Sequence, residues 1–132
     1  MLKVLPIQLK KEQQAACEIC GVPFIASDLA YRAENDGEFG GVCQFRIEGG
    51  KGYIDTLSQV KDNDDFTLMF VLGRAAMNYI DLCGVHTCYA NPDAAPESLL
   101  LAIGLKKQED GTFYADLTGM FTGGCCSCKK EN

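Results

Sequence analysis

The segment VHTCYAN carries the residue types of a Cys–His nucleophile, because His86, the only histidine of the chain, lies two residues before Cys88. In an extended strand both side chains would point to the same face. Their Cβ atoms would be about 6–7 Å apart, whereas activation of a thiol by a histidine requires a direct hydrogen bond. We therefore expect a structural or partly exposed histidine rather than a catalytic pair.

A cluster of acidic residues opens the long apolar segment DNDDFTLMFVLGR. An EF-hand loop counted from Asp62 would need glycine at its sixth position and glutamate at its twelfth, but these positions hold Thr67 and Gly73. Aspartate is instead a preferred N-cap, since its carboxylate accepts hydrogen bonds from the first N–H groups of a helix. The cluster thus indicates a solvated turn with a helix N-cap at Asp64 or Asp65.

Cysteine is frequent, with eight residues in a chain of 132. One CxxC pair and the tail sequence CCSC together supply five thiols that could bind zinc or an iron–sulfur cluster: Cys17, Cys20, Cys125, Cys126 and Cys128. A strong zinc signature has two CxxC pairs on turns, whereas here one pair falls in a predicted helix and the other group is CCxC. A metal site, a thiol or redox role of the tail, and a tail without function all remain open.

The composition suits one ordinary domain with a sizeable core, since 47% of the residues are hydrophobic. The net charge is −6, and phosphate contacts need clustered lysine and arginine, so we expect no nucleic-acid partner. No run reaches the roughly 18 apolar residues of a membrane-spanning helix, and the N-terminal segment lacks a signal-peptide apolar region. We therefore expect no membrane partner and a cytoplasmic protein with reduced cysteines.

Hydrophobic periodicity and turn residues predict ten elements within a domain over residues 1–122, followed by a cysteine-rich tail over residues 123–132. Helices are expected at 10–20, about 64–83 and 96–103, with strands at 2–9, 29–35, 41–49, 52–60, 85–91 and in a closing hairpin over 105–118. The order β-α-β-β-β-α-β-α-β-β defines an α+β class with a mixed, mostly antiparallel sheet. The second helix is apolar almost all round, so we expect it to lie centrally across the sheet.

This order resembles the GNAT (N-acetyltransferase) superfamily, and CYANPDAAPESLLLAIGL is similar to that family's N…A…L…GF segment. The resemblance implies an N-acyltransferase that uses acetyl-CoA or another acyl-CoA and acts on a small amine. Asp55, on the fourth strand, would be the general base. The implied cofactor contacts lie in the fourth strand, the turn after it, the start of the long helix and the end of the fifth strand: Leu57, Ser58, Gln59, Val60, Lys61, Asp65, Phe66, Thr67 and Asn91.

Two positions depart from the family pattern. Glycines and a Gln or Arg normally form the pyrophosphate turn, but this chain has DDFTLMF there, and carboxylates repel a diphosphate. The tyrosine that often protonates the departing thiolate is replaced by Leu100. The resemblance is therefore to a divergent member. The alternative is a catalytically inactive binding or regulatory module, and such a module could form a homodimer.

Overall fold

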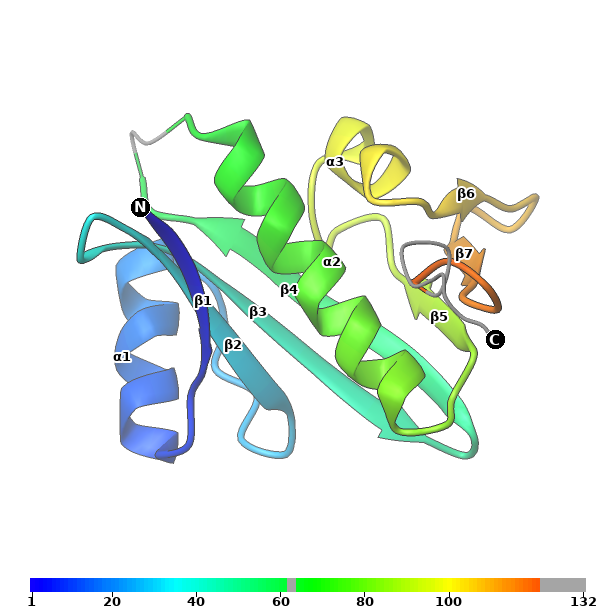
Figure 1. Cartoon of the computed structure of the whole chain (residues 1–132), viewed down its shortest axis with the longest axis horizontal. Helices are drawn as coiled ribbons and strands as arrows, with labels where there is room; N and C mark the ends of the chain where they lie inside the picture. Colours follow the sequence, from blue (N-terminus) through cyan, green and yellow to red (C-terminus); the bar gives the residue numbers. More distant parts are fainter. Residues whose placement is uncertain (62–63, 122–132) are drawn as a thin grey trace, which may run out of the picture.

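The computed structural model describes residues 1–61 and 64–121, which form a sheet with helices on both faces (Figure 1). The strands are β1 (Leu2–Pro6), β2 (Leu29–Asn35), β3 (Glu38–Glu48), β4 (Lys51–Gln59), β5 (Thr87–Ala90), β6 (Lys106–Lys107) and β7 (Phe113–Asp116). The helices are α1 (Lys10–Cys20), α2 (Phe66–Leu82) and α3 (Glu97–Ala102). Within the described residues the sheet has seven strands in the order β1-β2-β3-β4-β5-β7-β6.

The predicted α+β class and the predicted order of elements are both confirmed. Only β4 and β5 pair in parallel, among the strands of the described chain, so the sheet is mixed and mostly antiparallel as expected. β3 begins at Glu38, earlier than predicted, because Asp36 and Gly37 both have positive φ and form a two-residue turn that returns directly into the strand. β1 ends at Pro6 rather than at Leu9, which stands as the N-cap of α1.

Helix α2 crosses the sheet over β1 to β5, which confirms its predicted central position (Figure 1). Its buried side includes Leu72, Met77 and Ile80, all without exposed surface. Gly52 allows the helix to come close to β4, because a Cβ built there would lie 2.5 Å from Ile80 Cγ2. No helix in residues 1–61 and 64–121 is long and apolar enough to cross a membrane.

Helix α1 packs on the opposite face of the sheet, against β3. The side chains of β3 alternate between the two layers. Cys43 and Phe45 belong to the core under α2, and Val42 packs with Ala16 and Cys20 of α1. On this α1 face of the sheet, polar side chains of β3 and β4 lie beside α1 and the loop that follows it.

Candidate functional site

Asp55 occupies a β-bulge in β4. Gln44 pairs with Thr56 and Phe45 pairs with Ile54, so Asp55 has no partner position on β3. The bulge explains how Ile54 and Leu57, three residues apart, both enter the core under α2. Asp55 and Thr56 consequently both line the pocket on the other side of the sheet.

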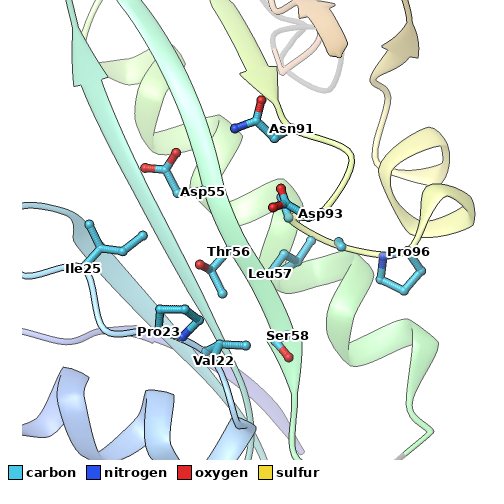
Figure 2. A pocket seen from close by; sticks show the side chains of 12 residues that line it. Val22, Pro23, Ile25, Asp55, Thr56, Leu57, Ser58, Asn91, Asp93 and Pro96 are labelled. Atoms are coloured by element: carbon cyan, nitrogen blue, oxygen red, sulfur yellow. The ribbon is translucent and has the colours of Figure 1, made fainter. Parts of the chain in front are cut away.

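Two neighbouring pockets meet at Asp55 and Asn91, which line both of them. The larger, about 510 Å³, lies between β4 and two loops, 22–25 and 91–96, and is called the loop pocket here. Figure 2 shows Asp55 and Asn91 at one end of it and Val22 and Pro23 at the other. The second, about 280 Å³, lies beside the β6–β7 hairpin and is called the hairpin pocket. Asp55 is thus placed where two separate molecules could meet.

The Asp55 carboxylate is held by an arginine. Arg46 Nε donates a 3.0 Å hydrogen bond to Asp55 Oδ2, and its guanidinium lies 4.0 Å from the centre of the Tyr53 ring. The Asp55 side chain retains 15% exposure, so it is largely shielded yet still reaches both pockets. This arrangement fixes one carboxylate oxygen and suits Asp55 to accept a proton.

Asp28 is a second carboxyl group at this site, and no sequence pattern singles it out. It has no exposed surface, and within the described residues neither carboxyl oxygen has a hydrogen-bond partner. Burial first, and then a hydrogen bond from its protonated form to Asp55 and the Asp55 charge, raise the pKa of Asp28 to about 7, although Arg46 and Lys10 act in the opposite direction. Because Asp28 lies in the unremarkable segment ASDL, only its three-dimensional surroundings reveal it.

A buried amide network fixes the loop that lines the loop pocket. Gln13 of α1 donates a 2.9 Å hydrogen bond to Gln44 Oε1, and both side chains have no exposed surface. The same Gln44 oxygen accepts from the Ile25 N–H, and Gln44 Nε2 donates to the Pro23 carbonyl and to Thr56 Oγ1. The loop is thereby tied to α1, β3 and β4 at once.

The residues implied for cofactor contacts fall into several environments. Leu57 and Ser58 line the loop pocket, and both also line a third pocket of about 300 Å³ with Gln59 and Phe66, here called the helix pocket. Asn91 is exposed at the end of β5. The Leu57 N–H, however, already donates a 2.9 Å hydrogen bond to the Ala94 carbonyl, so the chain itself bridges β4 and the segment after β5 at this point.

The turn into α2 is capped from within the chain. Of the two predicted N-cap residues, Asp64 and Asp65, it is Asp65 that caps the helix, and its Oδ1 accepts from the Leu68 N–H at 3.0 Å. Its own N–H donates to Gln59 Oε1 at 3.1 Å. Val60 N–H donates to the Gly40 carbonyl, while Lys61 and Thr67 are exposed. Asp62 and Asn63 of the acidic cluster lie outside the described residues.

The other sequence candidates lie apart from these pockets. His86 Nδ1 lies 2.6 Å from Asp81 Oδ1 at the exposed end of α2, and Cys88 is buried in the core, so the expected structural role of His86 agrees with its position. Leu100 is fully buried. Cys17 and Cys20 are buried free thiols of α1. Their tail partners in the metal hypothesis, residues 125, 126 and 128, lie outside the described residues.

No family model matches the sequence, and no curated protein matches it significantly. Solved structures do resemble the fold. The ribosomal-protein-S18-alanine N-acetyltransferase of Escherichia coli has a TM-score of 0.68 at 14% identity, over 100% of this chain and 98% of that chain. PaiA N-acetyltransferase of Thermoplasma acidophilum, in complex with coenzyme A, has a TM-score of 0.69 at 11% identity, over 88% and 99%.

A GNAT family acetyltransferase of Brucella melitensis, in complex with acetyl-CoA, has a TM-score of 0.68 at 14% identity, over 88% of each chain. At these identities the likeness establishes the fold alone, and the chemistry has to be inferred from the residues of the site. The chain therefore has the GNAT fold, as the order of its elements predicted.

Proposed function

We propose that the chain is an acyltransferase that moves an acyl group from an acyl-CoA to a small cationic amine. The observation that carries this proposal is the position of Asp55 at the boundary of the loop pocket and the hairpin pocket. Acyl transfer needs a donor and an acceptor that meet beside a proton acceptor. An acyl thioester in the loop pocket and an amine in the hairpin pocket would meet at this carboxylate.

The pantetheine part of an acyl-CoA suits the pockets better than its diphosphate does. The loop pocket and the helix pocket share Leu57, Ser58 and Pro96, so together they give the pantetheine arm a continuous path along β4. The α2 N-terminus is less suitable for phosphate, because the Asp65 carboxylate already accepts from the Leu68 N–H there. A glycine-rich pyrophosphate turn is absent from the sequence at this place, so we infer weak diphosphate binding. When bound, the thioester would supply the electrophilic carbonyl carbon.

The hairpin pocket has the charges expected of an amine site. Its lining includes the carboxylates of Asp55 and Asp110 and the amide oxygens of Asn91 and Gln108. An ammonium group prefers such acceptors, and the acidic net charge of the whole chain favours approach of a cation. Arg46 on the same wall is already engaged with Asp55. Asp110 Oδ1 accepts from the N–H and the hydroxyl of Thr112, so Asp110 Oδ2 is the oxygen that would receive an ammonium group.

Binding and turnover test the proposal separately. In a melting scan, acetyl-CoA at 100 times its dissociation constant would add about 2.7 kcal/mol of stability, which is a shift of several degrees for a domain of this size. Turnover is followed by mass spectrometry of a panel of primary amines and polyamines, because the exposed Cys83 thiol would react with thiol-detecting dyes. Asp55→Asn is expected to lower acylation at least about tenfold.

Asp36→Asn is the matched control, since it removes the same charge from an exposed turn that lines none of the three pockets described above. Loss of activity in both variants would argue against a specific role for Asp55. No melting shift at millimolar acetyl-CoA, together with no acylated amine, would end the proposal in favour of the alternative. That alternative is a GNAT-fold binding module without catalysis, which the bond from Leu57 to Ala94 and the buried Leu100 favour.

A further inference from the structure

The Asp28 and Asp55 carboxyl groups come within hydrogen-bonding reach of each other from the two sides of β3. Leu29 pairs with Phe45, and Phe45 pairs with Ile54, so Asp28 precedes β2 on one side of β3 and Asp55 follows Ile54 on the other. The bulge turns Asp55 toward the α1 face, where the amide network also holds the segment that leads to Asp28. Segments distant in the sequence thus bring two acids together in a buried setting.

Asp28 and Asp55 can form a hydrogen bond with each other only if one of the two carboxyl groups is protonated. Two carboxylates have only acceptor oxygens and cannot bond to each other. Asp28 is fully buried, and no residue of the described chain donates to either of its carboxyl oxygens. A buried charge in such a position is costly, whereas a protonated Asp28 is neutral and donates its hydroxyl to the Asp55 carboxylate.

The surrounding charges favour the proton on Asp28 rather than on Asp55. Arg46 of β3 donates directly to Asp55 and stabilises its ionised form. Lys10 of α1 bonds to the backbone carbonyl of Asp28, not to its carboxyl group. Cys43, on β3, is buried and its pKa is raised well above the ordinary value by burial, so this thiol stays neutral. Of the two cations, Arg46 bonds to a carboxyl group of the pair, that of Asp55, and Lys10 bonds to neither carboxyl group.

We propose that Asp28 and Asp55 share one proton and act together as a single proton acceptor, with Asp55 facing the ligand and Asp28 as the positioning residue behind it. In the doubly ionised form the pair takes one proton from an ammonium group at Asp55, and the amine nitrogen keeps the electron pair. The proton then rests in the hydrogen bond between the two carboxyl groups. The identity of the proton donor rests on the proposed function, but the shared proton needs no substrate.

The pair is tested by carbon-13 NMR of the aspartate side-chain carboxyl groups in the full chain between pH 4 and 10. In the wild type we expect a carboxyl signal that titrates near neutrality and is lost in Asp28→Asn. In Asp55→Asn the Asp28 midpoint should fall by at least about one pH unit, because the repelling charge is replaced by an amide donor. Asp36→Asn should leave the midpoint unchanged.

An Asp28 that stays ionised from pH 5 to 9 in the wild type would overturn the proposal, even where a variant fails to fold. An Asp28 midpoint that is the same in Asp55→Asn would also overturn it, since burial alone would then account for the titration. If an amine is acylated, the rate in the wild type should rise with pH through the same midpoint. Asp28→Asn should lose that rise and at least about tenfold in kcat/KM.

These readouts separate the two proposals. A shared proton with no acylation of any amine would remove the proposed function and leave the pair in place. Acylation with a pH profile that is unchanged in Asp28→Asn would support the function and exclude Asp28 from proton transfer.

Discussion

Gln13 and Gln44 join α1 to the sheet through a 2.9 Å hydrogen bond between two side chains that have no exposed surface. Gln44 also holds the loop beside the loop pocket, through the Ile25 N–H and the Pro23 carbonyl. Buried amides of this kind stabilise a fold only when all of their partners are present.

Gln44→Leu is therefore expected to destabilise the fold by about 2–4 kcal/mol, because the Ile25 N–H loses its acceptor and the Pro23 carbonyl loses its donor. Gln13 Nε2 also loses one of its two acceptors and keeps the Ile25 carbonyl. Urea unfolding measures the change. Gln14→Leu is the matched control on the exposed side of α1 and should alter stability by less than about 0.5 kcal/mol. Equal effects of the two substitutions would mean that the network contributes little.

Gly52→Ala is expected to destabilise the fold by about 1–3 kcal/mol through overpacking against α2. The added Cβ would lie 2.5 Å from Ile80 Cγ2 and 3.0 Å from the Thr87 carbonyl oxygen. Ile80→Ala opens space at the first of these contacts, so the double variant should be more stable than the sum of the two single effects requires. Additive effects in urea unfolding would argue against the close approach.

Much of the fold could be predicted because local residues determine its boundaries. Helix α1 ends at Cys20, as predicted, since Gly21 adopts the left-handed conformation that follows a helix. β2 has its predicted bounds because the Asp36–Gly37 turn ends it sharply. The start of β5 is predicted less accurately. β5 begins at Thr87, two residues later than expected, because the Val85 N–H donates to the Ile80 carbonyl at the end of α2 instead of pairing in the sheet.

The site could be predicted only in part. Asp55 stands out because the sequence places it on the fourth strand, but an uninterrupted alternation gives no indication of the bulge that turns it toward the pockets. Asp28 cannot be recognised from its neighbours, because its burial depends on Gln44 and on strand register far along the chain. The bond from the Leu57 N–H to Ala94 is likewise a property of the folded loop.

If acyl-CoA binds as proposed, Asp65→Asn should strengthen CoA binding by about two- to fivefold at low salt. The variant removes one negative charge from the α2 N-terminus, and asparagine still caps the helix, so stability should change little. Calorimetric titration with CoA measures the effect, which should shrink as the salt concentration rises. Asp36→Asn is the control for net charge; the same affinity in both variants would place the diphosphate away from this helix.

The stability of the protein should depend on pH through Asp28. Burial, and then the hydrogen bond and charge of Asp55, raise the pKa of Asp28 from 3.8 to about 7, so the folded chain binds this proton more tightly than the unfolded chain does. The contribution of Asp28 is therefore most favourable below about pH 4, decreases as the pH rises, and levels off above about pH 7.

The amide introduced by Asp28→Asn resembles the protonated acid and does not titrate. The two proteins should thus differ least near pH 4, and the variant should gain on the wild type as the pH rises, by about 2–4 kcal/mol at pH 8. Urea unfolding of both proteins from pH 4 to 9 measures this difference, in which the titration of groups distant from Asp28 cancels. A difference that does not change with pH would mean that Asp28 is ionised in the folded protein throughout this range.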